Sequence, residues 1–242
     1  MKSNKLFEAK VLENINLDEK HYILKLELSE KPEVNPGEFF MAKCWGKNGP
    51  VLNRPFSVFN YNNGILDFFI RKKGIGTELF SQLEPGDSVE LIGPLGNGFR
   101  NCENYIAVGA GMGIAPINYA AEKFNLDVVY GINNVISLFE FDKKGFKVCS
   151  LDGSCGIKGD AFSETITKFN NGNYKGIIAC GPDGFLDRML EYCVENKISA
   201  QLSYEERMGC GTGFCMSCVR KIGGATYKIC TDGPVIHINM EE

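Results

Sequence analysis

The sequence is poor in histidine and lacks long runs of apolar or like-charged residues. It has 2 His in 242 residues, which leaves little scope for acid–base catalysis by histidine. It contains no stretch of about 18 apolar residues, and its start lacks the apolar core of a signal peptide, so we expect a soluble, cytoplasmic protein with no membrane partner. The net charge is -4 without long charged runs, which gives no electrostatic footprint for nucleic acid.

The composition favours several domains and a metal site. With 242 residues and 44% hydrophobic content, the chain can bury one large core or two ordinary ones and still form a small module. The 10 Cys are expected to be reduced thiols in a cytoplasmic protein rather than a disulfide scaffold. A cluster of such cysteines therefore indicates bound metal.

Three segments with different patterns follow one another along the chain. Residues 1–100 contain short alternating strands separated by Gly and Pro, which predicts an antiparallel β-barrel. Residues 101–200 alternate strand and helix, which predicts an α/β domain with a parallel sheet. Residues 201–242 are rich in Gly and Cys and too few for an apolar core of their own, so we expect a metal to staple them. The elements expected in the middle segment are strands 105–108, 126–130 and 176–180 and helices 114–124 and 184–195.

Four cysteines near the C-terminus have the spacing of plant-type ferredoxins. The pattern is C-x4-C-x2-C followed, after eleven further residues, by a fourth Cys, and it predicts a 2Fe-2S cluster. Glycines at 209, 211 and 213 would let backbone N–H groups approach the sulfurs. A zinc site is the alternative, although zinc usually takes two C-x2-C pairs and only one is present. The predicted ligands are Cys210, Cys215, Cys218 and Cys230, and the cysteines outside this cluster are expected to be small buried hydrophobes or, at Cys180, part of a nucleotide site.

A flavin site is predicted in the first segment. The run Arg54-Pro55-Phe56-Ser57 by itself is compatible with a surface turn, but the run Phe69-Ile70-Arg71 follows it and leads into a Gly-x-Gly-Thr sequence at 74–77. We expect Thr77 to cap a short helix over 78–83, whose free N–H groups would face a pyrophosphate. Arg54 and Arg71, together with the start of this helix, therefore predict an FAD site.

A pyridine-nucleotide site is predicted in the second segment. The glycine-rich turn Gly109 to Pro116 follows a strand and opens a helix, and Cys180-Gly181-Pro182 ends a later strand that would face the same crevice. The spacing is not the usual Rossmann fingerprint, and the second strand ends without the acidic residue expected for the ribose. Residues 131–140 contain no Arg or Lys for a 2'-phosphate, so NAD is preferred over NADP.

Taken in order, these motifs resemble those of the ferredoxin-NADP reductase superfamily: R-P-x-S, G-x-G-T, the glycine-rich turn and C-G-P. The stretches 93–99 (GPLGNGF), 205–211 (EERMGCG) and 232–235 (DGPV) are similar to those of electron-transfer subunits of class 1B dihydroorotate dehydrogenases. One departure is Cys155 in the run 152–156, where a Tyr or similar residue is expected.

The resemblance implies a flavin-binding β-barrel at 1–100, an NAD-binding α/β domain at 101–200 and a 2Fe-2S domain at 201–242. It implies electron flow from dihydroorotate through the FMN of a separate catalytic subunit to the cluster, FAD and NAD, in a heterotetramer with two copies of each subunit. No acid–base catalytic residue is needed in this chain. The implied FAD contacts are Arg54, Pro55, Phe56, Ser57, Phe69, Ile70, Arg71, Gly76 and Thr77, and the NAD contacts predicted above are Gly109, Gly111, Gly113, Pro116, Cys180, Gly181 and Pro182.

Two other functions remain open from the sequence. One is a reductase subunit serving a hydrogenase, a sulfide dehydrogenase or a ferredoxin-linked complex. The other, of a different class, is a zinc-stapled binding module without enzymatic activity.

Overall fold

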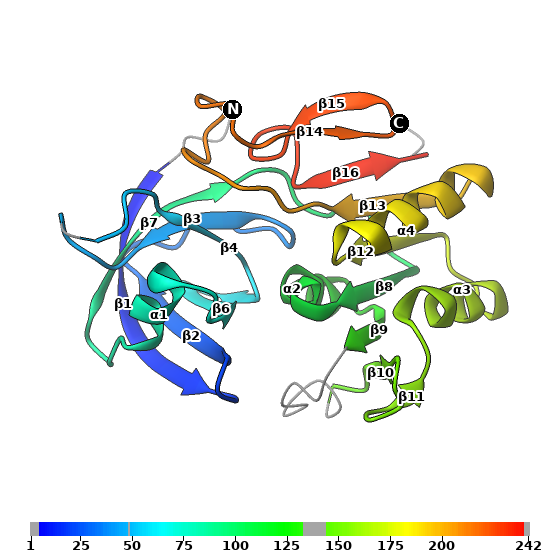
Figure 1. The fold of residues 1–242 in the computed structure, drawn as a ribbon, viewed down its shortest axis with the longest axis horizontal. Helices are drawn as coiled ribbons and strands as arrows, with labels where there is room; N and C mark the ends of the chain where they lie inside the picture. Colours follow the sequence, from blue (N-terminus) through cyan, green and yellow to red (C-terminus); the bar gives the residue numbers. More distant parts are fainter. Residues whose placement is uncertain (1–4, 48, 133–143, 240–242) are drawn as a thin grey trace. The chain divides into compact units, whose positions relative to one another are not determined.

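A computed structural model describes residues 5–47, 49–132 and 144–239, and Figure 1 shows its elements. The chain divides into two compact units. The first takes the chain up to Gly98 together with Glu205–Pro234, and the second takes Phe99–Tyr204 together with the chain from Val235 onward. The segment expected to form a separate C-terminal domain is therefore shared between the two units.

The first unit is built on a seven-stranded sheet whose neighbouring strands all run antiparallel. This confirms the predicted antiparallel β architecture. The alternation at Ser88, Val89, Glu90 and Leu91 places the two apolar side chains in the core and the polar ones in solvent. In sheet order the strands are β4 (Arg54–Ser57), β3 (Phe39–Lys43), β7 (Ser88–Leu95), β1 (Lys5–Asn16), β2 (His21–Leu28), β6 (Ile65–Arg71) and β5 (Asn60–Asn62), and the helix is α1 (Ile75–Ser81).

The cysteine-rich segment of the first unit packs on this sheet. A Cβ on Gly211 would lie 2.5 Å from Cγ of Met41 in β3 and 3.2 Å from Cδ1 of Leu95 in β7, so the loop lies directly on the two strands. Asn97 also holds the segment, because its N–H donates to the Gly233 carbonyl at 2.7 Å and its side chain donates to the Asp232 carbonyl at 3.0 Å. The segment thus gains core contacts from the sheet. Its own strands are β14 (Val219–Ile222) and β15 (Ala225–Lys228), which form a hairpin.

The second unit contains a mostly parallel sheet, which confirms the predicted α/β architecture. The final strand joins this sheet antiparallel to its neighbour, an addition that the sequence analysis did not foresee. In sheet order the strands are β11 (Ile157–Lys158), β10 (Lys147–Ser150), β9 (Asp127–Ile132), β8 (Tyr105–Ala110), β12 (Gly176–Cys180), β13 (Ser199–Ser203) and β16 (Val235–Ile238).

Helices cover both faces of the parallel sheet. The connection from β8 to β9 and the one from β11 back to β12 run in opposite directions along the sheet, so right-handed crossovers place their helices on opposite faces. Figure 1 shows this arrangement, with the helix between β8 and β9 on one side of the sheet and the helices that follow β11 and β12 on the other. The helical elements are η1 (Gly111–Gly113), α2 (Ile114–Phe124), α3 (Ala161–Asn171) and α4 (Asp183–Glu195).

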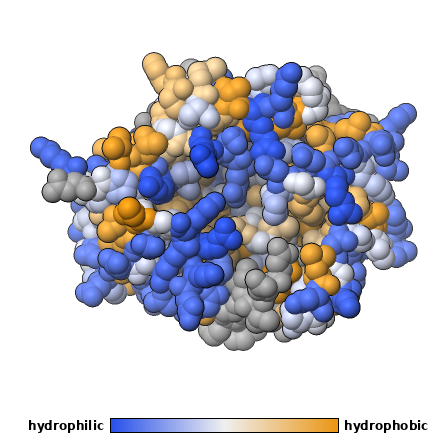
Figure 2. Space-filling model, in the orientation of Figure 1, coloured by the Kyte–Doolittle hydropathy of each residue, from blue (hydrophilic) through white to orange (hydrophobic). Residues whose placement is uncertain are grey.

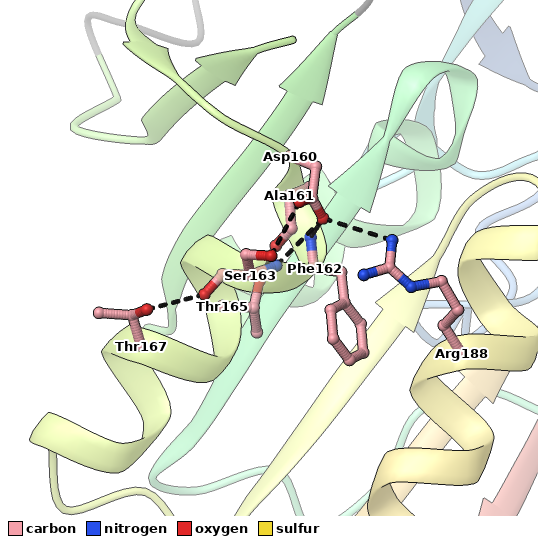
Figure 3. A network of polar contacts seen from close by, with 7 residues as sticks. All are labelled: Asp160, Ala161, Phe162, Ser163, Thr165, Thr167 and Arg188. Atoms are coloured by element: carbon pink, nitrogen blue, oxygen red, sulfur yellow. Dashed lines mark hydrogen bonds and ion pairs between the residues drawn. The ribbon is translucent and has the colours of Figure 1, made fainter.

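A polar network joins the two helices that share a face (Figure 3). The carboxylate of Asp160 caps α3 by accepting from the N–H groups of Phe162 and Ser163, both at 3.1 Å. Arg188 of α4 lies 3.6 Å from Asp160 and 4.3 Å from the centroid of the Phe162 ring. Burial opposes ionisation of Asp160, but hydrogen bonds from Ser163 and the charge of Arg188 outweigh it and lower the pKa of the carboxyl.

None of the helices in the described ranges is long and apolar enough to cross a membrane. On the face shown in Figure 2, hydrophobic residues lie in several separate groups among hydrophilic ones.

Candidate functional site

The residues predicted to bind FAD come from β4, β6 and α1, and the structure brings several of them together. A Cβ on Gly76 would lie 2.5 Å from Nε of Arg54, so the guanidinium rests against the backbone of α1. The ring of Phe56 packs against Phe68 of β6 and Phe80 of α1, with centroids 5.4 and 5.1 Å away. Pro55 and Ser57 lie on the same short strand, where they pair with Met41 and Phe39 of β3.

The expectation that Thr77 caps the short helix is wrong. Gly74 is the N-cap and α1 begins at Ile75, so Thr77 is the third residue of the helix. Its hydroxyl accepts from the N–H groups of Lys73 and Gly74 at 2.8 and 3.2 Å and donates to the Gly74 carbonyl at 2.9 Å. Thr77 therefore closes the turn that precedes the helix. Its carbonyl accepts from the buried hydroxyl of Tyr22 at 2.7 Å, which ties the turn to β2.

The three predicted FAD residues in β6 differ in exposure. The ring of Phe69 is 4% exposed and lies 5.9 Å from the imidazole of His21 and 5.6 Å from the ring of Phe59, while Ile70 is 2% exposed. Arg71 is exposed at the end of the strand. Any contribution of Phe69 and Ile70 to a ligand is therefore through their backbone, whereas Arg71 offers its guanidinium.

The predicted NAD residues meet at the carboxyl ends of β8 and β12. A Cβ on Gly113 would lie 2.2 Å from the carbonyl oxygen of Cys180 and 2.6 Å from N of Gly181, so only glycine fits this contact. Gly109 lies close to the start of α2, because a Cβ on it would be 2.8 Å from Cα of Ile114. Helix α2 has the predicted bounds and contains the buried Pro116. Gly111 has φ +56 and no atom within 4 Å of its Cβ position. Pro182 is the N-cap of α4.

These two neighbouring strands also mark the point where the strand order reverses. The chain leaves β8 toward β9 on one side, whereas β12 lies on the other side of β8 and leads to β13. In open α/β sheets, ligands bind outside the carboxyl ends of the strands at such a point. The glycine-rich turn and Cys180 therefore lie where open α/β sheets bind their ligands. The Cys180 side chain is 1% exposed.

The cation-poor stretch 131–140, on which the choice of NAD rests, lies outside the described residues beyond Ile132.

The departure at Cys155 falls in a tight turn after β10. Ser150 Oγ accepts from the N–H of Cys155 at 3.0 Å and donates to its carbonyl at 2.8 Å. Cys155 and Cys44 are half-buried, while the other cysteines that were expected to be buried, Cys102, Cys149 and Cys193, are buried.

The four predicted ligands belong to the segment that packs on β3 and β7, three of them before the β14–β15 hairpin and Cys230 just after it. The Sγ atoms of Cys218 and Cys230 are 3.2 Å apart. Sγ of Cys210 accepts from the N–H groups of Thr212 and Cys215, both at 3.4 Å. Sγ of Cys230 accepts from Gly213 N at 3.1 Å. Backbone N–H groups thus point at the sulfurs, as the glycines in the sequence predict.

The electrostatics of the four thiols are unequal. Burial opposes ionisation of Cys210, but the N–H groups of Cys215 and Thr212 outweigh it and lower the pKa to about 6. Burial and the neighbouring sulfur of Cys218 raise the pKa of Cys230 to about 12. Two thiolates this close repel each other, so the Cys218–Cys230 pair is stable in the charged form beside a cation. A bound metal would supply that cation.

Two neighbours of the predicted sites were missed by the sequence analysis. Ser217 Oγ lies 3.1 Å from Sγ of Cys215 and accepts from Gly209 N at 3.0 Å. Trp45 lies under the guanidinium of Arg54, whose Cζ is 5.4 Å from the ring centroid. The position of Ser217 inside the C-x2-C pair was a usable signal, whereas nothing in the spacing of Trp45 links it to Arg54.

Comparisons with known proteins agree with these observations. The profile of the iron-sulfur cluster binding domain of dihydroorotate dehydrogenase B matches residues 205–240. Among solved structures, that of an NADH-dependent reduced ferredoxin-NADP oxidoreductase superposes with a TM-score of 0.80 at 25% identity, covering 98% of this chain and 90% of that one. A ferredoxin NADP+ reductase from Neisseria gonorrhoeae shares the fold, with a TM-score of 0.65 at 16% identity over 79% of this chain and 91% of that one.

Curated relatives are similar over almost the whole chain. The dihydroorotate dehydrogenase B (NAD(+)) electron transfer subunit of Clostridium acetobutylicum is 32% identical over 235 residues, 93% of either chain. The protein with the same description from Caldanaerobacter subterraneus subsp. tengcongensis is 35% identical over 239 residues, 94% of this chain and 95% of that one. This chain therefore belongs to the family of electron transfer subunits of NAD-dependent dihydroorotate dehydrogenase B.

Proposed function

We propose that this oxidoreductase subunit carries one FAD and one 2Fe-2S cluster and passes electrons from the FMN of a dihydroorotate-oxidising catalytic subunit to NAD. The observation that carries the proposal is the cysteine loop. It brings the sulfurs of Cys218 and Cys230 to 3.2 Å, directs backbone N–H groups at those of Cys210 and Cys230, and coincides with the stretch that matches an iron-sulfur domain. In pyrimidine synthesis such a subunit would take the electrons that the oxidation of dihydroorotate to orotate releases.

The spacing of the cysteines and the close Cys218–Cys230 pair support a 2Fe-2S cluster rather than zinc. A zinc site usually takes two C-x2-C pairs, and this segment has one, Cys215 and Cys218. A cluster with two irons instead takes its thiolates in pairs, and Cys218 with Cys230 forms such a pair. Iron and sulfide analysis of the purified protein, with its visible spectrum, tests the assignment; a colourless zinc protein would contradict it.

For FAD, we propose that the side chains of Arg54, Arg71 and Ser57 contact the cofactor. Backbone groups would come from Phe69, Ile70, Gly76 and Thr77. Pro55 and Phe56 would shape the strand that joins Arg54 to Ser57. Arg54 and Arg71 would offer charge-assisted hydrogen bonds to phosphate. FAD supplies the conversion between hydride transfer, which moves two electrons, and transfer to a cluster, which moves one. The residues of the chain need only bind and orient, because no proton has to be abstracted from a carbon acid here.

For NAD, the proposed contacts are backbone groups of Gly109, Gly111 and Gly113, with Pro116 fixing the start of α2 and Cys180, Gly181 and Pro182 lining the facing strand end. The close approach of Gly113 to Cys180 keeps side chains out of this edge of the sheet. Backbone N–H groups at the start of α2 can then approach a pyrophosphate.

Replacing Arg54 by Ala should weaken FAD binding more than it weakens the fold. The substitution removes a charge-assisted contact worth about 1.5–3 kcal/mol, which corresponds to roughly a 10- to 150-fold increase in Kd. Equilibrium dialysis of the apoprotein against FAD measures this. Lys25→Ala, which removes a surface cation paired with Glu13 in the same unit, is the matched control and should retain FAD. Equal FAD affinity of Arg54→Ala and the control would contradict the site.

NADH should reduce the bound flavin much faster than NADPH, because residues 131–140 offer no cation for a 2'-phosphate. Stopped-flow absorbance of the anaerobic protein with each nucleotide measures the two rates. Equal rates would show that the inference from these residues is wrong.

The partner and the assembly follow from the family resemblance. We propose a complex with an FMN-containing catalytic subunit, with two copies of each chain. The mass of the co-purified complex tests both the partner and the stoichiometry. A complex with a ferredoxin or another reductase component would favour the alternative of a ferredoxin-linked reductase, for which the similarity to the NADH-dependent ferredoxin-NADP oxidoreductase is the supporting observation.

A further inference from the structure

Trp45 is held rigidly in the loop after β3. It is the one tryptophan of the chain. Its Nε1–H donates to the Pro50 carbonyl at 2.6 Å, and its ring meets Phe80 of α1 edge to face with centroids 5.6 Å apart. A Cβ on Gly49 would lie 2.3 Å from Cδ1 of Trp45, so the indole lies directly on the backbone of the loop. The hydrogen bond, the edge-to-face contact and the close approach to Gly49 together restrict the ring.

The guanidinium of Arg54 is confined by this ring and by two other groups. Its Cζ lies 5.4 Å from the centroid of Trp45, and Nη1 donates to the Leu52 carbonyl at 2.6 Å. The Nε edge abuts Gly76, where a Cβ would be only 2.5 Å away. The guanidinium is thus set in one orientation between the loop, β4 and α1.

The charge of Arg54 has no anionic partner in the part of the chain that the structure describes. The contacts found for it are the Leu52 carbonyl, the indole and Gly76, and none of them is a carboxylate. A guanidinium has five N–H donors, so donors remain beyond the one used on Leu52. An oriented cation with spare donors is suited to an anionic ligand such as a pyrophosphate.

Orientation before binding matters because a free arginine side chain loses rotamer freedom when a ligand immobilises it. The indole face attracts the guanidinium and fixes it in advance. Removing the indole face would leave Arg54 charged but mobile, so part of its contribution to binding would be lost without any change in the ligand contact itself.

We infer that Trp45 is a positioning residue for the flavin site: it holds the Arg54 guanidinium against Gly76, so that the remaining donors of Arg54 are ready for the pyrophosphate of FAD. This inference rests on the proposed FAD function. It assigns Trp45 no contact with the cofactor.

A double-mutant cycle on the full chain tests the inference. FAD affinity is measured by equilibrium dialysis for wild type, Trp45→Leu, Arg54→Ala and the double variant, with Trp45→Phe as the variant that keeps an aromatic face. We expect Trp45→Leu to raise the Kd for FAD by about three- to tenfold, the range of a cation–π contact at a partly exposed site, and Trp45→Phe to raise it less. In the Arg54→Ala background, Trp45→Leu should have little further effect, because Trp45 acts through Arg54.

Phe7→Leu controls for a general loss of barrel stability. Phe7 is 2% exposed and packs on Phe40 inside the same sheet. We expect this variant to unfold at lower temperature without a comparable loss of FAD affinity. If Trp45→Leu does not fold, Trp45→Phe replaces it in the cycle and is measured both in the wild-type chain and in Arg54→Ala.

The possible outcomes separate this inference from the proposed FAD site. If wild type and Arg54→Ala bind FAD equally, or if wild type does not bind FAD, the proposed site is overturned. The inference about Trp45 is then overturned with it. If Arg54→Ala weakens binding but the two substitutions act additively, or if Trp45→Leu is without effect, the FAD site stands and the positioning role of Trp45 is overturned.

Discussion

Replacing Cys215 by Ser should remove nearly all iron from the protein while FAD remains bound. Cys215 is the exposed member of the four cysteines, so its substitution leaves the buried part of the loop in place. A serine oxygen is a poor substitute for a thiolate, and three sulfurs do not complete the set of ligands that a 2Fe-2S cluster takes. The expected result is loss of the cluster rather than loss of the fold.

FAD should be retained because its proposed ligands do not belong to the loop. The Arg54–Gly76 contact joins β4 to α1, whereas the cysteine loop lies on β3 and β7. Iron, sulfide and flavin analysis of the purified variant measures both parts of the prediction. Full iron content in Cys215→Ser would refute the ligand assignment.

Cys44→Ser is the matched control. Cys44 lies in the same unit and is half-buried, and burial followed by the charge of Asp87 raises the pKa of its thiol to about 11, so it stays protonated near neutral pH. This variant should keep both iron and FAD. Loss of iron from Cys44→Ser as well would point to general instability instead of a lost ligand.

The isolated chain should transfer electrons from NADH to an artificial acceptor such as ferricyanide but should not oxidise dihydroorotate. The motifs of the chain serve a flavin, a nicotinamide nucleotide and iron, and none of them supplies a base beside a pocket for an organic acid. Steady-state assays with each donor measure the two activities. Turnover of dihydroorotate with NAD by this chain alone would contradict the division of labour between two subunits.

The histidines support this expectation. His21 lies 3.0 Å from the carboxylate of Asp18 and stacks on Phe69. His237 belongs to β16, and burial followed by the charge of Arg100 lowers its pKa, which favours the neutral form. Both histidines lie on strands, His21 on β2 and His237 on β16.

Elements with a strong local signal were predicted well from the sequence. The helix at 114–124 and the strand at 176–180 have the expected bounds; the helix begins directly after Gly113, and the apolar strand ends directly before Gly181. The cysteine spacing likewise identified residues that the structure gathers in one loop. In each case the information lies in one continuous stretch of the chain, the longest being the 21 residues from Cys210 to Cys230.

Features that depend on distant partners were missed. The strand Val235–Ile238 joins the parallel sheet through pairing with β13, and four residues carry no pattern that names this partner. The start of α1 was missed for a local reason: Thr77 has the chemistry of a helix cap, but its hydroxyl binds the N–H groups of the preceding turn, so the helix starts earlier. Trp45 and Arg54 meet only because β3 and β4 are neighbours in the sheet.

Reconstitution with the catalytic subunit tests the central claim most directly. The chain loaded with FAD and cluster is mixed with the FMN subunit, and the reduction of NAD by dihydroorotate is followed at the absorbance of NADH. The account predicts that the wild-type pair restores this activity and that a pair containing FAD-loaded Cys215→Ser does not. An equal rate with Cys215→Ser would show that electrons reach NAD without the cluster and would contradict the account.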